Sequence, residues 1–146
     1  MSASNAFETS LLSHIFANAD IANIGDATGL RGSSTAGVLY ISLHTGDPGE
    51  GGSQNTTECG YTSYARVSVA RSGAGWTVSG NNASNATAVT FPTATGGSET
   101  ASHFAIGTAS SGAGVLLFKG SLNATLAISN GIAPSFAIGE LDINAD

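Results

Sequence analysis

Residues 38–52 read VLYISLHTGDPGEGG, and this stretch decides the fold. Apolar residues at positions 39, 41 and 43 alternate with Tyr40, Ser42 and His44. A period of two predicts a strand, expected over 38–43, with one face buried and the other face polar. The strand runs into a turn centred on the sequence Asp-Pro-Gly, because proline presets its φ angle and glycine accepts left-handed conformations. Most later segments are predicted to be further strands laid against this one.

The composition indicates a single domain that packs against other proteins. A chain of 146 residues is long enough for one domain with a buried core. Hydrophobic residues make up 41% of the chain, but charged residues only 10%, and the difference is filled by small and polar residues. Few charges and many small residues are typical of a chain whose surface meets partners.

The charge balance excludes nucleic acid as a partner. The formal net charge is −6, with only four arginine and lysine residues, so no basic stripe is available to neutralise phosphates. The single cysteine, Cys59, rules out a disulfide within the chain. No apolar run reaches the length of a transmembrane segment, and the first residues lack the pattern of a secretory signal. We therefore expect no membrane partner and a protein made in the cytosol.

One helix is expected, near the start of the chain. Phe7, Leu11, Leu12 and Ile15 recur at helical spacing. Small polar residues precede them in position to cap the first turn, and Glu8 lies near the positive end of the helix.

The chain between this helix and the first strand is rich in Asn, Asp, Gly, Ser and Thr, with Ile21, Ile24 and Leu30 as isolated apolar anchors. Such a composition indicates a long ordered loop or a segment that settles on a partner. The expected organisation is one domain, 1–146, that contains the helix at 1–18, the loop at 19–37 and a β domain at 38–146.

The remaining sequence predicts short strands separated by turns. Asn130-Gly131 is a strong hairpin signal, and the Asn-rich segment 81–85 is expected to be a bend. Further strands are expected at 61–70, 76–79, 86–91, 100–107, 115–122, 125–128, 135–138 and 140–143. We predict a mainly β fold, namely an antiparallel, sandwich-like domain of about seven to nine strands with one N-terminal α-helix.

Two positions leave alternatives open. The strand that begins at Val115 has apolar residues on both faces, which is typical of a central strand or of an interface. Arg66 lies in the middle of the strand 61–70, so it is either an ion-pair partner for a loop acid or an interface residue.

No catalytic or metal-binding motif is evident. The chain has no Gly-x-Ser-x-Gly elbow, and its three histidines are far apart in the sequence. His44 and His103 could meet across strands and bind a metal ion, but a pair on the polar face of the sheet is the simpler interpretation. We expect no enzyme activity, no catalytic residues, no metal and no cofactor.

Several short motifs occur in an order that resembles a known family. They are a Leu-Leu-x-His-x-Phe helix near the start, followed by residues 39–49, Tyr61, Tyr64-Ala65-Arg66, Phe91-Pro92 and His103-Phe104-Ala105-Ile106. Together they resemble small virion proteins of tailed bacteriophages, whose members are labelled tail-fibre-like, head-fibre or capsid cement (decoration) proteins. The resemblance covers nearly the whole chain. It implies a non-enzymatic structural part of a virus particle, with one helix packed on a β domain.

This sequence departs from the family pattern in two places. The segment between the helix and the first strand is longer, and residues 53–58 are an insertion. Such loops are where proteins of this kind differ in the partner that they contact.

The resemblance implies a mechanical role. We expect a capsid cement or decoration protein on the capsid surface of the virion, where it bridges and stabilises neighbouring capsomers. Its partners would be the major capsid protein and further copies of itself, as a dimer or trimer, and many weak contacts would add up by multivalency. The leading contact residues are expected in the helix, in the long loops and, for the last of them, in the strand 61–70: Phe7, Leu11, Ile15, Ile21, Ile24, Leu30, Arg31, Asp47, Glu50 and Arg66.

Two other functions stay open at this point. A tail-fibre or receptor-binding module would recognise a host surface glycan, with Tyr61, Tyr64 and Trp76 exposed in one shallow groove. A small hydrolase would need His44 or His103 beside a serine or a carboxylate in a cleft.

Overall fold

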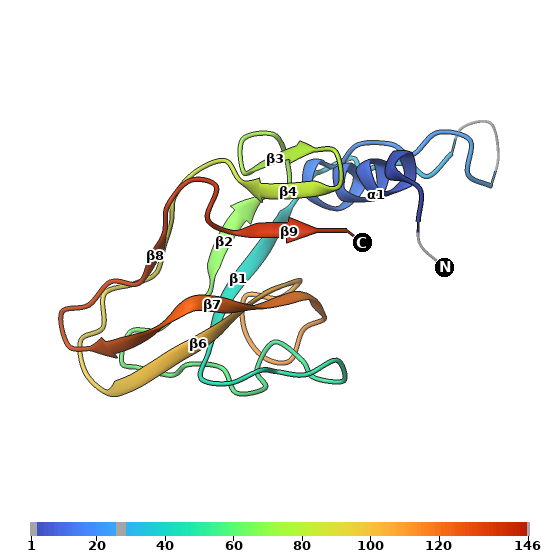
Figure 1. The fold of residues 1–146 in the computed structure, drawn as a ribbon. Coiled ribbons are helices and arrows are strands. Elements are labelled where there is room, and N and C mark those ends of the chain that lie inside the picture. The colour runs from blue at the N-terminus through green and yellow to red at the C-terminus, as the bar shows by residue number, and fades with distance from the viewer. Residues whose placement is uncertain (1–2, 26–28, 146) are drawn as a thin grey trace. The chain divides into compact units, whose positions relative to one another are not determined.

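The computed structural model describes residues 3–25 and 29–145, and within them it contains one helix and nine strands. The elements are α1 (Asn5–Ala17), β1 (Val38–His44), β2 (Val67–Ala70), β3 (Trp76–Ser79), β4 (Asn82–Asn85), β5 (Val89–Thr90), β6 (Ser98–Gly107), β7 (Leu116–Ser129), β8 (Ser135–Phe136) and β9 (Asp142–Asn144) (Figure 1). The strands form sheets in the orders β2-β1-β6-β7, β3-β4-β9 and β5-β8. The prediction of a mainly β, antiparallel fold with a single N-terminal helix is confirmed.

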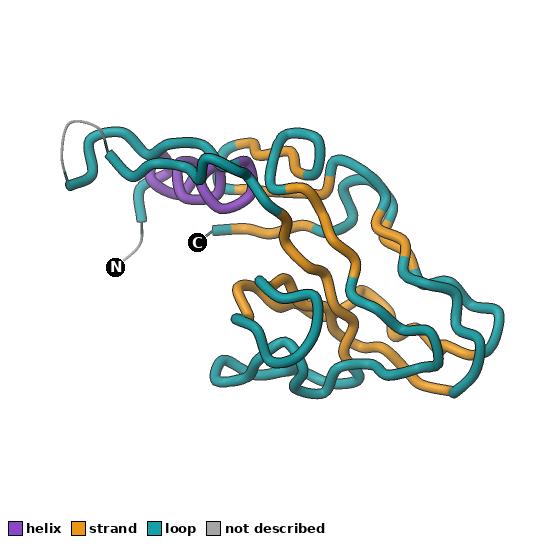
Figure 2. The backbone as a smooth tube through the Cα atoms, turned by 180° about the vertical axis from the view of Figure 1, so that it is seen from behind, coloured by secondary structure: helices purple, strands orange, loops and turns teal. Residues whose placement is uncertain are grey.

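The chain divides into two compact units, and each is built from segments that are far apart in the sequence. The unit that we call the helix unit consists of Met1–Val38, Val69–Ala88 and Phe136–Asp146. The other, the sheet unit, consists of Leu39–Ser68 and Val89–Ser135. Figure 2 shows long loop segments between the strands.

Within the helix unit, α1 packs on β3 and β4. The helix begins after Ser4, whose hydroxyl oxygen accepts a hydrogen bond from the Phe7 N–H. It ends at Asn18, which adopts the left-handed conformation with a φ of 57°. Leu12 and Phe16 are buried, and the ring of Phe16 lies with its centroid 4.6 Å from that of Trp76. These apolar contacts hold the helix on the small sheet.

The segment predicted to be an Asn-rich bend is instead the central strand of the small sheet. β4 pairs with β3 on one side and with β9 on the other, and the turn falls at Gly80, where φ is 61°. The buried amide of Asn85 donates to the Ala137 carbonyl over 2.8 Å and accepts from the Leu141 N–H over 2.9 Å. The sequence-based expectation was wrong because Asn85 bonds to backbone that is distant in the sequence, which composition does not reveal.

Within the sheet unit, β6 lies between β1 and β7, and it includes the strand predicted over 100–107. Leu39, Ile41 and Leu43 are buried, so the inward face of β1 is confirmed. The other face of β1 is not left open, because Ser42 and His44 are also fully buried. A sheet strand whose second face is covered by a loop loses the alternating pattern of exposure.

The strand predicted over 61–70 is much shorter than expected. Only Val67–Ala70 forms β2, and residues 61–66 are a loop in which Ser63 has a positive φ of 82°. Alternation in this stretch has another cause, since Tyr61 is buried and Arg66 turns inward to a loop acid. The strand predicted over 86–91 is likewise reduced to the two residues of β5.

β7 is the edge strand of its sheet, not a central one. It pairs with β6 in two regular stretches, and the register shifts between Ala101 and His103 and again between Ile106 and Gly107 on β6. Phe104 faces Gly120 directly across the pair. Of the 14 residues of β7, only Ile128 is buried. The central position left open by the sequence is therefore excluded for this strand.

Candidate functional site

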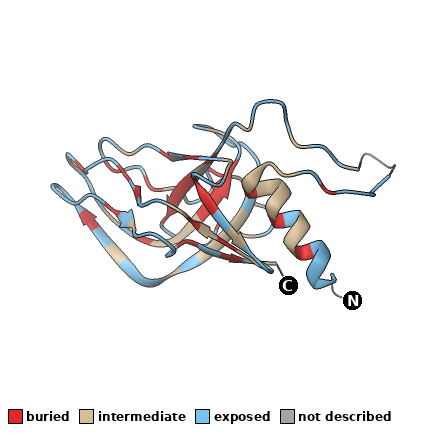
Figure 3. Cartoon of the chain, turned by 90° about the horizontal axis from the view of Figure 1, so that it is seen from above, coloured by how far each residue is buried: buried red, intermediate tan, exposed pale blue. Residues whose placement is uncertain are grey.

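Among the described residues of the helix unit, five of the six exposed large apolar side chains belong to the segment Met1–Val38, and the sixth is Ile138. Phe7 is 42% exposed and Leu30 is 46% exposed. We call the following exposed residues the N-terminal apolar set: Phe7, Leu11, Ile24, Leu30 and Val38. Figure 3 shows that α1 carries exposed positions as well as buried ones. Exposed apolar side chains mark a contact surface where they adjoin one another in one patch.

Two predicted contact residues in the same segment are less exposed than the members of this set. Ile15 is half-buried. Ile21 is buried, and its backbone forms a reciprocal pair of 2.8 Å hydrogen bonds with Leu30. Ile21 thus anchors the loop, whereas Leu30 directs its side chain to solvent. Arg31 is exposed, with its guanidinium 3.1 Å from the Asp20 carboxylate, an arrangement that contributes little to stability.

The loop that follows the helix is fastened by Arg71, a residue that the sequence did not single out. Its guanidinium donates to the Ile15 carbonyl over 2.7 Å and to the His14 carbonyl over 2.8 Å. These are carbonyls of the last helical turn, which have no partner within the helix. The same group donates to the Ala36 carbonyl over 3.2 Å. One side chain therefore ties the end of α1 to the end of the loop.

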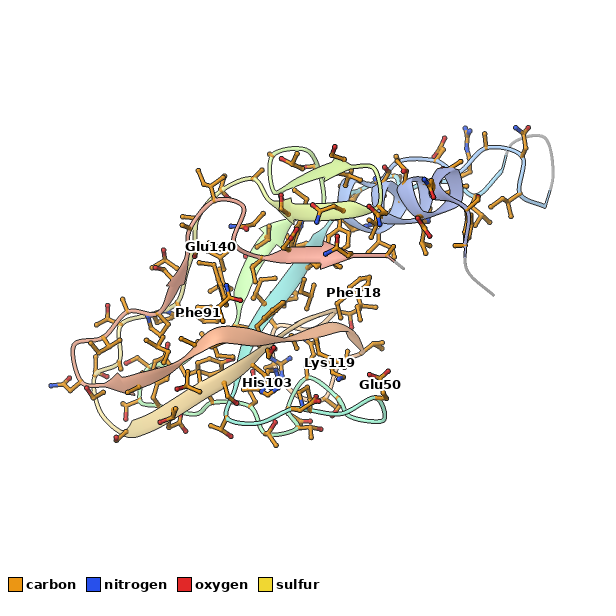
Figure 4. All side chains as sticks on the ribbon, in the orientation of Figure 1. Glu50, Phe91, His103, Phe118, Lys119 and Glu140 are labelled. Carbon is orange, nitrogen blue, oxygen red and sulfur yellow. The ribbon has the colours of Figure 1, made fainter. Side chains whose placement is uncertain are left out.

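Asp47 and Glu50, both predicted contact residues, form a surface cluster with Lys119. The Lys119 ammonium lies 3.1 Å from an Asp47 oxygen and 3.2 Å from a Glu50 oxygen. Figure 4 shows Lys119 and Glu50 side by side, with His103 nearby. The Gly49 N–H, and after it Lys119, lowers the pKa of the Asp47 carboxyl. The pKa of Lys119 is raised by Asp47 first and Glu50 second.

Arg66, the last predicted contact residue, is an ion-pair partner inside the sheet unit. Its side chain is only 2% exposed, and its Nε lies 2.7 Å from Glu58 Oε1. It also donates to the carbonyls of Ala109, over 2.8 Å, and Gly112, over 2.6 Å. Tyr64 donates its hydroxyl to the same carboxylate over 2.9 Å. Of the two roles left open by the sequence, the partner of a loop acid is confirmed.

Gln54 holds the same hairpin turn from a second side. Its side chain is fully buried, and its Oε1 accepts from the Ala109 N–H over 2.9 Å. The backbone N–H of Gln54 donates to the Ala113 carbonyl over 2.8 Å. Arg66 and Gln54 together fix the turn between β6 and β7.

A serine and a histidine do lie within hydrogen-bond distance, but they are not in a cleft. Ser42 Oγ is 2.8 Å from His44 Nε2, and both residues are fully buried. His44 Nδ1 lies 2.8 Å from the Thr56 carbonyl, which can only accept, so Nδ1 carries the proton. Burial lowers the pKa of His44 below its ordinary value of 6.5. His103 faces His44 across the β1–β6 pair, as the sequence allowed.

The thiol of Cys59 is also enclosed. Burial raises the pKa of the Cys59 thiol to about 12, with help from Glu99, which keeps the thiol protonated and unreactive. Across residues 3–25 and 29–145, no three histidine, cysteine or acidic side chains gather in a way that would hold a metal ion. The described part of the chain also has no helix with the length and apolar character needed to cross a membrane.

The aromatic groove expected for glycan binding is not formed as predicted. Trp76 is 1% exposed and Tyr61 is 3% exposed. The hydroxyl of Tyr61 donates to the Pro92 carbonyl over 2.9 Å, and Tyr64 packs edge-on against Tyr61 with centroids 5.2 Å apart. These rings serve as core packing, because a stacking platform for a sugar must present its face to solvent.

Comparison with known proteins identifies the family. No curated protein matches the chain. A family model described as "Podophage GP4 fiber I protein gp80" matches residues 2–144. The chain therefore belongs to this family of tailed-phage virion structural proteins.

Proposed function

We propose that this protein is a structural component of a phage fibre. The observation that carries the proposal is the match of residues 2–144 to a family described as a fiber protein. This description favours a fibre protein over a capsid cement protein. We therefore propose a role in a fibre in place of the bridging of capsomers expected from the sequence. The virion remains the expected location in either case.

In this proposal the N-terminal apolar set attaches the protein to another virion component. Its members are exposed, and the end of the loop that carries two of them, Ile24 and Leu30, is tied to α1 by Arg71. A surface whose supporting backbone is already fixed loses little conformational entropy on binding. The set is therefore suited to a permanent contact within a particle.

The fibre role that we propose is mechanical and runs no reaction. The Ser42–His44 pair is the arrangement most similar to a catalytic dyad, and its complete burial denies a substrate access to it. We also do not assign glycan binding to the Tyr61, Tyr64 and Trp76 rings, because two of the three are buried.

Labelling of intact particles tests the fibre proposal. A gold-conjugated antibody against the protein should decorate projecting fibres in electron micrographs, and particles made without the protein should lack fibre mass while retaining closed capsids. Uniform label over the capsid shell would instead support the cement role and overturn the proposal.

The attachment surface is tested separately by incorporation into particles. Phe7→Ser combined with Leu11→Ser should lower the number of copies per particle several-fold, since both side chains are exposed and neither supports the core. Ile138→Ser is the matched control, because Ile138 is 69% exposed but lies outside the set. Equal loss of copies in both variants would contradict the assignment of this surface.

A further inference from the structure

The dipeptide Asn130-Gly131, a hairpin signal in the sequence, forms an exposed turn after β7. The Ile132 N–H donates to the Ser129 carbonyl over 3.0 Å and closes the turn. Gly131 has a positive φ of 90°, a conformation that a residue without a Cβ adopts readily. The same dipeptide has a covalent chemistry that the fibre role does not use.

Asparagine followed by glycine is prone to lose the nitrogen of its side-chain amide. The backbone nitrogen of the glycine gives up its proton to water and bonds to Cγ of the asparagine, the C–N bond of the carboxamide breaks, and ammonia leaves. Water then adds to one of the two carbonyls of the resulting succinimide, and the ring opens to aspartate or isoaspartate. Glycine allows this attack because it has no Cβ to crowd the nitrogen. Asn130 is the only asparagine of the chain that glycine follows.

The fold holds the nitrogen that would attack. The Gly131 N–H donates to the Ala94 carbonyl over 2.8 Å, and the Ala94 N–H donates to the Ile132 carbonyl over 2.8 Å. In a succinimide, Cγ takes the position that the hydrogen of this N–H has in the intact chain. The Ala94 oxygen lies in the direction of that hydrogen, so the hydrogen bond opposes both the loss of the proton and the approach of Cγ.

We propose that Asn130 is a deamidation site gated by the Ala94–Gly131 hydrogen bond, and that it reacts only in molecules in which this pairing has opened. The substrate is the chain itself, and water is the co-reactant. Opening of this kind is a local event that does not require the whole protein to unfold. Asn130, Gly131 and Ala94 all belong to the sheet unit, so the proposal does not depend on the fibre assignment.

The two products differ in their effect on the turn. Aspartate adds a carboxylate to the stretch Thr100–Gly139, which has no acidic residue, and leaves the main chain unchanged. Isoaspartate also adds a methylene group to the main chain before the Gly131 nitrogen. The Gly131 N–H then no longer has the spacing that brings it to Ala94, so this product is expected to keep the pairing open.

Mass spectrometry of the full chain tests whether the site is labile. Wild-type protein is incubated at neutral pH, folded and in guanidinium chloride, and its peptides are analysed for aspartate and isoaspartate. In the denaturant, Asn130 should react at least about tenfold faster than Asn123, because Asn123 is followed by an alanine whose Cβ crowds the nitrogen. Gly131→Ala, compared in denaturant where the fold has no influence, should slow Asn130 to the rate of Asn123.

Amide hydrogen exchange tests the gate. The folded protein should react at Asn130 at least about tenfold more slowly than the unfolded chain, and by the same factor by which folding slows exchange of the Gly131 N–H, since both reactions need the same opening. Asn130→Asp is the control, because it has no amide nitrogen to lose and should leave exchange at Gly131 unchanged. Deamidation as fast in the folded protein as in denaturant, or Asn130 no faster than Asn123 in denaturant, would each overturn the proposal.

Discussion

The guanidinium of Arg66 meets the carboxylate of Glu58 through two hydrogen bonds of 2.7 Å, from Nε to Oε1 and from Nη2 to Oε2. This bidentate pair is nearly enclosed, with Arg66 2% exposed and Glu58 15% exposed. It joins the loop 45–60 to the hairpin turn 108–114, since Arg66 also donates to Ala109 and Gly112. The relationship makes Arg66 a residue that holds loops in place, and it leads to the first prediction.

Arg66→Ala should lower the free energy of unfolding by about 3 kcal/mol or more, because it leaves the Glu58 carboxylate enclosed without its partner. Arg66→Lys should recover only part of this loss, since an ammonium cannot make the bidentate contact. Urea unfolding monitored by fluorescence measures both changes. An Arg66→Ala variant as stable as the wild-type protein would contradict the role given to the pair.

A methyl group at Gly107 should destabilise the sheet unit. A Cβ there would overlap the Gln54 side chain, which is fully buried and held by the Ala109 N–H. We expect Gly107→Ala to cost about 2 kcal/mol of unfolding free energy through overpacking. Gly51→Ala is the control, because no atom lies within 4 Å of its Cβ position, and it should change stability by less than about 0.5 kcal/mol. Equal thermal midpoints for the two variants would refute this explanation.

Removing the Arg71 side chain should loosen the end of α1 together with the loop after it. Arg71→Ala deprives the His14, Ile15 and Ala36 carbonyls of a charged donor, and each such bond contributes about 1.5 kcal/mol or more. Hydrogen exchange should become faster in the last turn of α1, with β6 unaffected. Arg31→Ala removes only an exposed ion pair and should cost less than about 1 kcal/mol. Unchanged exchange in α1 of the Arg71 variant would argue against this contact.

The stability of the protein should fall as the pH drops below the ordinary pKa of histidine, partly because of His44. Burial lowers the pKa of His44 in the folded state below 6.5. Well above pH 6.5 the imidazole ring is neutral in both the folded and the unfolded state, so its titration does not change the free energy of unfolding. As the pH falls below about 6.5, the unfolded chain binds a proton that the folded protein does not, so the free energy of unfolding decreases until the pH passes below the folded-state pKa.

His44→Gln should remove this part of the pH dependence, although it lowers stability overall by disturbing the bonds to Ser42 and Thr56. The measurement is the slope of unfolding free energy against pH between about 7.5 and 5 for both proteins. A wild-type slope no steeper than that of the variant would show that His44 does not titrate as proposed. A ring titration by NMR gives the folded-state pKa directly.

The sequence by itself determined the class of the fold and the main apolar contacts. Alternation at Leu39, Ile41 and Leu43 predicted the buried face of β1, and the helical spacing of apolar residues near the start of the chain predicted the single helix. These features follow from the periods of helix and strand, which are local properties of the chain. The order of short motifs also pointed to tailed-phage virion proteins, and the match to a fiber family bears this out.

Only the tertiary structure decided which polar residues are enclosed and which strand lies at the edge. The alternating pattern of the strand predicts that Ser42 and His44 face solvent. Both are buried instead, and His44 bonds to the Thr56 carbonyl of the loop that follows. Asn85 belongs to a strand because its amide bonds to the distant Leu141. Likewise, β7 has the composition of a central strand, and its position at the edge depends on the pairing order. Such features arise from contacts between residues far apart in the sequence, which no local pattern records.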